Sequence, residues 1–254
     1  MALLEDMLAS MDEATEKNQA TVIDSIAAAS DFLLTLQGAR RLPPSFRKTI
    51  IGAIAGVWYD SAAGSISLMR EEFKDAFPGL ARKANETAEL NRIVNDYIGR
   101  YGARQAAEII DTTERQIRDL VNGGLSAGEA RDTVFRKISE RVPQIAEVRG
   151  LVISRTEAHA ASQFASQMMA ERSQIPLKKI WNSVNDSRTR DFGLSGRVSE
   201  FNHRIMNATT VPLQGRFQVP RRNGVPESLL FPGDPTGSAG NVINCRCIQT
   251  YVRA

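Results

Sequence analysis

A change of pattern near residue 173 constrains the fold of this chain more than any other feature. Before it, apolar residues such as Val22, Ile26 and Leu33 recur every three or four positions, which is the spacing of one helix face. After it, strand-like runs such as residues 177–184 are separated by prolines and glycines. We therefore expect an α+β fold: a mainly α-helical N-terminal region, then a small α+β module with a short antiparallel sheet and long irregular loops.

Local signals predict where the later helices begin and end. Residues 111–114 read Asp-Thr-Thr-Glu and predict a helix start, and Gly123-Gly124 predict that helix's end. Ser126 and Glu129 have the spacing of a capping box, which predicts another start. Pro143 suits the first turn of a last helix ending near residue 173. Several separate helices are therefore expected before the strand-like part, and residues 207–240 are expected to be largely irregular.

Charge is unevenly distributed along the chain. From Arg172 to the end there are 12 Lys and Arg against 5 Asp and Glu, a net charge of +7, whereas residues 1–171 carry −4 and the whole chain carries +3. A basic segment predicts either a phosphate-bearing or acidic partner or a solvated surface, and charge alone leaves these open. Sequence-independent binding to double-stranded DNA is one such hypothesis, with Arg216, Arg221 and Arg222 as its candidate contacts.

The two cysteines, Cys245 and Cys247, are separated by one residue, which is too close for ordinary disulfide geometry and indicates a reducing compartment. A structural zinc site normally needs four ligands. His159 and His203 would bring the number of possible zinc ligands to four, but their spacing in the sequence gives no support for such a site. We expect two thiols packed or hydrogen-bonded in the terminal strand, and we predict no metal and no cofactor.

The N-terminal segment does not resemble a secretory signal, and Asp60 interrupts the most apolar stretch, residues 50–69. Gly52 and Gly56 in that stretch favour a closely packed helix hairpin in a protein or homo-oligomer, and no membrane association is expected. Phosphate-binding loops, dinucleotide-binding glycines, zinc-protease motifs and nucleophile elbows are all missing from the sequence. Conventional ATPase, dehydrogenase, metalloprotease and hydrolase functions therefore lack their chemistry.

Four short motifs follow one another in a fixed order, with Phe-Pro-Gly-Asp-Pro at residues 231–235 ahead of the last. This arrangement resembles the Mu F-like minor head proteins, also called head morphogenesis proteins, of tailed bacteriophages. The resemblance covers about residues 105–254. Its motifs are Ser154-Arg155-Thr156-Glu157, Lys179-Ile180-Trp181-Asn182, Asp186-Ser187-Arg188-Thr189-Arg190 and Asn244-Cys245-Arg246-Cys247.

The resemblance implies a structural, non-enzymatic virion protein at the portal vertex of the phage head, assembled in the host cytoplasm. It would act in head morphogenesis and in DNA packaging or delivery, in several copies, with the portal protein and the major capsid or scaffold protein as partners. The resemblance assigns residues 105–254 to the Mu F-like module. Residues 1–104 lie outside it, and their helices, with the small-residue face around Gly52 and Gly56, predict a helical assembly and portal-contact region. Two alternatives remain: an ADP-ribosyltransferase-like enzyme with a catalytic Glu157, and a DNA-binding protein ejected with the genome.

Within the module we expect structural roles for the motif residues. Asp186 should form an Asx turn, and Glu157 or Arg155 should pair with a charge near Arg188 or Arg246. The terminal segment should join its strand to that of Trp181. Relatives often place a histidine shortly after the Arg-Thr-Arg turn, whereas this turn looks shortened. The motif residues are Arg155, Glu157, Trp181, Asp186, Arg188, Asn244, Cys245, Arg246 and Cys247.

Overall fold

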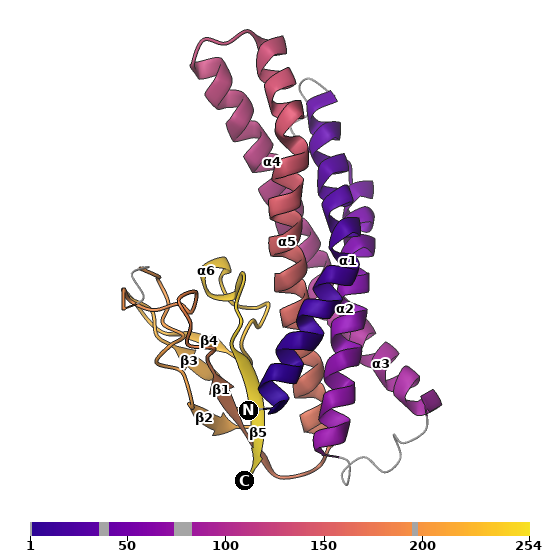
Figure 1. Cartoon of the computed structure of the whole chain (residues 1–254), viewed down its shortest axis with the longest axis vertical. Coiled ribbons are helices and arrows are strands. Elements are labelled where there is room, and N and C mark those ends of the chain that lie inside the picture. Colours follow the sequence, from indigo (N-terminus) through magenta and orange to yellow (C-terminus); the bar gives the residue numbers. More distant parts are fainter. Residues whose placement is uncertain (1, 36–40, 74–82, 195–197) are drawn as a thin grey trace. The chain divides into compact units, whose positions relative to one another are not determined.

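The computed structural model describes residues 2–35, 41–73, 83–194 and 198–254, and the α+β fold is confirmed (Figure 1). Helices come first and short strands follow. The helices are α1 (Ala2–Thr35), α2 (Ser45–Glu72), α3 (Lys83–Tyr97), the π-helical η3 (Ile98–Gly102), α4 (Ala103–Ser126) and α5 (Arg131–Arg172). The rest comprises β1 (Leu177–Asn182), β2 (Thr210–Pro212), β3 (Phe217–Val219), β4 (Glu227–Leu229), the short helix α6 (Ala239–Val242) and β5 (Ile248–Arg253).

The chain forms two compact units, each built from segments that are distant in sequence. Unit 1 comprises Met1–Ala14, Trp58–Tyr97 and Arg155–Ala254, and unit 2 comprises Thr15–Val57 and Ile98–Ser154. The bounds of these units differ from the predicted boundary between an assembly region (1–104) and a Mu F-like module (105–254). That functional boundary stays a prediction.

Unit 2 has an aliphatic core between helices. The glycines of its helices allow close approach, because a Cβ at Gly56 would clash with Asn18, and one at Gly150 would clash with Ile23. The Gly56 side of the predicted small-residue face is therefore covered within unit 2. The buried core residues are Ala29, Leu33, Leu34, Leu42, Ile117, Val134, Ile138 and Val142.

The predicted helix start at residues 111–114 is wrong, because α4 runs without a break from Ala103 to Ser126. The hydroxyls of Thr112 and Thr113 donate instead to the carbonyls of Glu108 and Ile109, at 2.7 and 2.8 Å. Threonine can bond back in this way inside a helix, which satisfies the hydroxyl without a cap. The glycine pair 123–124 is likewise accommodated within α4 and does not end it.

The predicted capping box and the helix start at Pro143 are also wrong. Glu129 lies before α5, and its carboxylate accepts from Lys137 Nζ at 2.7 Å. Pro143 lies in the interior of the 42-residue α5. A proline there costs about 3 kcal/mol in an isolated helix, but Val142 and Ala146 beside it are fully buried, at 2% and 0% exposure. Packing therefore overrides the local signal.

The main sheet of unit 1 has the order β2-β1-β5 and is antiparallel. Six residue pairs join β1 to β5, from Leu177↔Arg253 to Asn182↔Ile248, so the predicted pairing of the terminal strand with the Trp181 strand is confirmed. Most of residues 207–240 is irregular, as expected, but this segment also contains β2 and the antiparallel β3–β4 pair. Three residues per strand give too weak a local pattern to be found from sequence.

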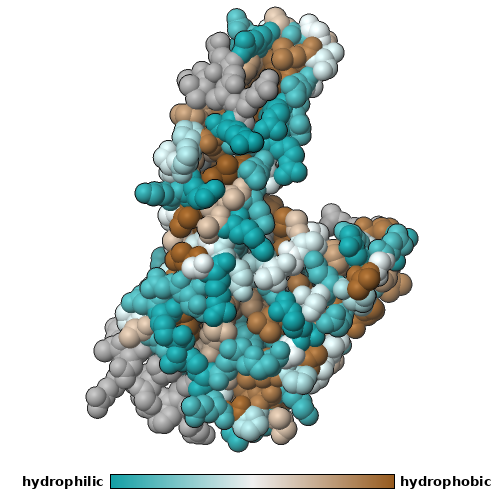
Figure 2. Space-filling model, turned by 180° about the vertical axis from the view of Figure 1, so that it is seen from behind, coloured by the Kyte–Doolittle hydropathy of each residue, from teal (hydrophilic) through white to brown (hydrophobic). Residues whose placement is uncertain are grey.

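None of the helices in the described part of the chain has the length and apolar character needed to cross a membrane. On the face shown in Figure 2, hydrophobic residues form small patches separated by hydrophilic ones.

Candidate metal centre

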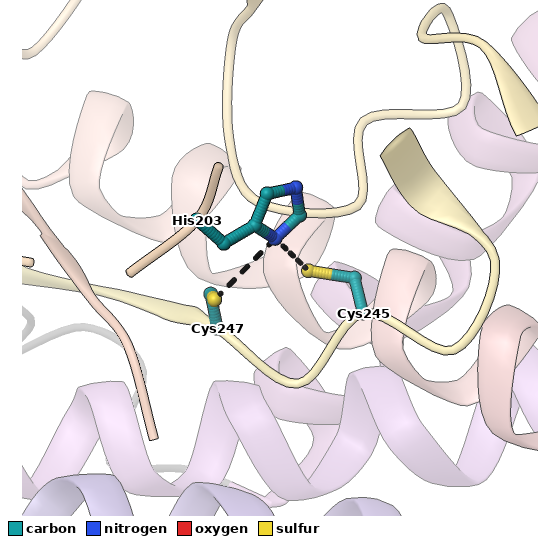
Figure 3. Close-up of side chains that lie close together, drawn as sticks. All are labelled: His203, Cys245 and Cys247. Carbon is teal, nitrogen blue, oxygen red and sulfur yellow. Dashed lines mark hydrogen bonds between the residues drawn. The ribbon is translucent and has the colours of Figure 1, made fainter. Parts of the chain in front are cut away.

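Three metal-ligating side chains converge in unit 1: those of His203, Cys245 and Cys247 (Figure 3). His203 lies between β1 and β2, and the two cysteines lie between α6 and β5. The Nδ1 atom of His203 lies 3.6 Å from each of the two Sγ atoms, and the three ligand atoms all lie within 4.8 Å of one another. All three side chains are buried, with 1 to 3% exposure.

The orientation of the His203 ring follows from its other nitrogen. Asn241 Nδ2 donates to the Glu227 carboxylate at 2.6 Å, so Asn241 presents its carbonyl oxygen to His203 Nε2, also at 2.6 Å. An amide oxygen can only accept, so Nε2 carries the proton and donates. In the neutral form of the ring, the Nδ1 lone pair therefore faces the two sulfur atoms. The backbone carbonyl of His203 accepts a short hydrogen bond from the Ser183 hydroxyl, which further fixes the residue.

The two thiols differ in acidity. Burial raises the pKa of both, and the neighbouring Cys245 sulfur raises the pKa of Cys247 further, well above the usual value. For Cys245, the contact with Cys247 and the neighbouring imidazoles of His203 and His159 outweigh burial, and its pKa falls well below the usual value. Cys245 is thus the thiolate-forming member of the pair.

A small pocket of about 10 Å³ borders the centre and is lined by His203 and Cys247. Such a volume holds roughly one water molecule. Arg188, Arg190 and Arg246 also line this pocket.

The predicted Asx turn at Asp186 is confirmed. Its Oδ1 atom accepts from the amide of Arg188 at 2.9 Å and from the Thr189 hydroxyl at 3.2 Å. Its Oδ2 atom pairs with Arg246, the central residue of the terminal motif. Partial burial raises the pKa of Asp186, but the hydrogen bonds from Arg246 and the Arg188 amide outweigh it, and the pKa falls to about 2.

The helix motif on α5 also contacts the terminal motif. The Thr156 hydroxyl accepts from the amide of Asn244 at 3.1 Å, and His159 Nε2 lies 2.7 Å from the carbonyl oxygen of Cys247. Glu157 accepts from the indole N–H of Trp58 at 2.7 Å. Arg155 is exposed. The carboxylate that pairs with Arg246 is that of Asp186.

The Phe-Pro-Gly-Asp segment packs on the same helix. Gly233 has φ of +77°, and a Cβ there would clash with the His159 ring, so glycine is needed both for conformation and for close approach. Asp234, at 1% exposure, accepts from the amides of Leu230 and Thr236 at 2.8 and 2.9 Å. It also accepts from Arg216 at 3.1 Å.

The candidate nucleic-acid residues Arg216, Arg221 and Arg222 are all exposed. Arg216 nevertheless pairs with Asp234, and Arg221 pairs with Glu200. These two guanidinium groups thus already contact carboxylates, as an internal structural role requires. DNA binding by the three arginines stays a prediction.

The strand motif contributes two buried side chains. Trp181 contacts His203 and Phe217 edge to face, with ring centroids 5.3 and 5.2 Å apart. Lys179 is fully buried, and its Nζ atom donates to the Leu230 carbonyl at 2.6 Å. Burial lowers the pKa of Lys179 to about 8.

Sequence reasoning did not predict that His203 lies beside the two cysteines, and it did not single out Asn241. His203 is 42 residues from Cys245 in the chain, and no single helix or strand carries both residues. The only available signal was chemical: a chain with two histidines and two cysteines offers few possible partners for a thiol pair.

Comparisons with known proteins give one distant relative and no family. The chain is 25% identical over 151 residues to the uncharacterized protein YqbB of Bacillus subtilis (strain 168). The match covers 59% of this chain and 46% of that relative, so this chain spans less than half of the relative's length. No family model and no solved structure matches the chain.

Proposed function

We propose that this protein is a structural minor head protein of a tailed bacteriophage, located at the portal vertex of the virion head and assembled in the host cytoplasm. Its partners would be the portal protein and the major capsid or scaffold protein. It would act in head morphogenesis, DNA packaging or DNA delivery, and it would not turn over a substrate.

One observation carries this proposal: the motifs that resemble the Mu F-like family bind one another across long stretches of sequence. Arg246 of the terminal motif pairs with Asp186 of the turn motif, 60 residues away. The amide of Asn244 donates to Thr156 of the helix motif, 88 residues away. The helix, turn and terminal motifs thus form one connected set of internal contacts, which is the arrangement expected of an architectural module.

The same contacts favour a structural role over the enzymatic alternative. In an ADP-ribosyltransferase, Glu157 would have to face an open substrate site. Its side chain is 5% exposed and accepts from the Trp58 indole, a contact suited to holding α2 against α5 within unit 1. A pocket of about 10 Å³ beside the terminal motif is far too small for a dinucleotide.

The test is quantitative protein analysis of purified virions and empty proheads of the phage that encodes this chain. We expect the protein in both at low copy number, and cross-linking should join it to the portal protein. A matched strain that lacks its gene should give a reduced yield of DNA-filled heads. Absence of the protein from both particles, together with a normal yield from the deletion strain, would overturn the proposal.

NAD titration of the purified protein addresses the enzymatic alternative directly. We expect no binding, and the Glu157→Gln variant should complement the deletion strain if it folds. Saturable NAD binding that depends on Glu157 would instead identify an enzyme.

A further inference from the structure

We propose that His203, Cys245 and Cys247 bind one Zn²⁺ ion through Nδ1 and the two Sγ atoms. Thiolate and imidazole are ligands that select zinc over the oxygen-preferring Mg²⁺ and Ca²⁺. This site does not depend on the proposed role in the phage head.

The separations of the donor atoms suit a shared tetrahedral ion. Zn–S bonds of about 2.3 Å and Zn–N bonds of about 2.0 Å in tetrahedral geometry place a nitrogen and a sulfur roughly 3.5 to 3.6 Å apart. The two Nδ1–Sγ distances are both 3.6 Å. Both sulfurs also lie on the side of the ring to which the Nδ1 lone pair points (Figure 3). One ion can thus contact all three donors with little movement of the chain.

The surroundings of His203 match the outer shell of a metal site. A ligating histidine usually donates its second ring nitrogen to an acceptor that fixes the tautomer and the ring plane. Here Asn241 is that acceptor, and Glu227 fixes Asn241 in turn. Asn241 is therefore a positioning residue for the proposed ion.

Charge balance permits the burial of this ion. Two thiolates neutralise Zn²⁺, so the loaded centre carries no net charge in a site where an unpaired charge would be costly. The nearest cationic side chain of the terminal motif, Arg246, pairs with Asp186, and Arg190 donates to the carbonyl of Ile243. Both arginines line the pocket, and these contacts engage their guanidinium groups.

The small pocket lined by His203 and Cys247 provides room for a fourth ligand of the proposed ion. Its volume of about 10 Å³ suits a single water molecule. Three protein ligands and one water complete a tetrahedral zinc centre.

The experiment titrates the full-length reduced protein with Co²⁺ as a spectroscopic substitute and then with Zn²⁺. We expect one Co²⁺ per chain, with a thiolate-to-cobalt charge-transfer band and strong visible bands from tetrahedral coordination, and displacement by one Zn²⁺. Cys245→Ser, Cys247→Ser and His203→Gln should each weaken Co²⁺ binding at least 100-fold or abolish these bands. Lys178→Met is the control, because it changes an exposed residue of β1 in the same unit and should keep the charge-transfer band.

A second variant and a second measurement keep the proposal falsifiable where ligand variants unfold. Asn241→Leu should weaken Zn²⁺ affinity about 10- to 100-fold while the cobalt spectrum keeps its form. In the unmodified protein, Zn²⁺ should protect both cysteines from alkylation, as read by mass spectrometry. A folded, reduced protein without the charge-transfer band, equal alkylation with and without Zn²⁺, or a disulfide between the two cysteines would each overturn the proposal.

Discussion

The two cores of this protein are built from different kinds of residues. The core of unit 2 is aliphatic and lies between helices. The core around the sheets of unit 1 is aromatic and sulfur-containing, with Trp181, Phe217 and the two cysteines among its members. Helical spacing of apolar side chains is enough to specify the first kind of core, whereas the second depends on particular shapes and ring contacts.

Unit 1 also buries many polar side chains, and several of them have a specific hydrogen-bond partner. Lys179 donates to a backbone carbonyl, Asp234 accepts from two amides, and His203 contacts Asn241. A buried polar group that loses its partner costs about 1 to 3 kcal/mol. We infer that unit 1 tolerates substitution less than unit 2, and the predictions below test this difference.

The largest effect should follow removal of residues 241–254. This truncation removes all six residue pairs between β1 and β5 and the packing of Ile248 against Met7 and Met11. Cooperative unfolding of unit 1 should be lost. Hydrogen exchange measures this: amides of β1 should exchange rapidly while those of α4 in unit 2 stay protected.

Val252→Ala is the control for the truncation, because Val252 lies in β5 but is 42% exposed. It should leave both units folded. Equal loss of protection in α4 and β1 after truncation would mean that the units unfold together and that the two cores are not independent.

The next effect should come from Trp181→Ala. Trp181 is fully buried against Phe217 and His203, so its loss should lower the free energy of unfolding by about 3 to 5 kcal/mol. In unit 2, the volume-conserving Leu33→Met should cost less than about 1.5 kcal/mol. Urea-induced unfolding of the two variants measures both losses in the free energy of unfolding. A cost for Trp181→Ala as small as that for Leu33→Met would remove the distinction between the cores.

The difference between the helical and the sheet-containing parts also explains which features of the fold could be predicted from the sequence. The helical character before residue 173 was predicted correctly from periodicity. The α+β class and the β1–β5 pairing were predicted correctly from strand-like residue types and the position of the last strand-like run. The helix breaks at residues 111–114 and Pro143 were wrong, because buried neighbours hold α4 and α5 continuous across local stop signals. Local signals are worth about 1 to 3 kcal/mol each, which tertiary packing can exceed.

The candidate site was predictable only in part. The Asx turn at Asp186 depends on neighbouring residues, and the sequence predicted it correctly. The approach of His203 to the two cysteines depends on how an irregular loop returns to the terminal segment, and no periodic pattern encodes that path. Metal binding stays a proposal, as does the function of the motifs.

A smaller, pH-dependent effect should come from Lys179. Its pKa is about 8 in the folded state against 10.5 for an ordinary lysine. Between these values the unfolded state binds more protons, so the free energy of unfolding should rise with pH, by about 1 kcal/mol per pH unit at the steepest. Lys179→Met should abolish this rise.

Lys178→Met is the matched control for Lys179, because Lys178 is the adjacent residue of β1 and is exposed. It should keep the rise, and the comparison of the two variants cancels the titration of all other groups. Identical pH profiles for the two variants would show that Lys179 is as well hydrated in the folded protein as Lys178, contrary to a buried polar network in unit 1.

The smallest effect should come from the ion pair between Asp186 and Arg246, because both side chains are about one-third exposed and screened by water. At neutral pH, Asp186→Asn should lower the free energy of unfolding by about 1 kcal/mol or less. The folded-state pKa of Asp186, about 2, lies below the ordinary value of 3.8, so its contribution is complete above that value and is lost as the pH falls toward 2. The variant should therefore approach the unmodified protein in stability at the acid end of a series of urea-unfolding experiments.

Glu200→Gln, which removes the carboxylate of the exposed Arg221 pair, is the control and should change stability less at neutral pH. If Asp186→Asn instead costs as much as Trp181→Ala, the polar link between the turn and the terminal motif, rather than the aromatic core, dominates the stability of unit 1.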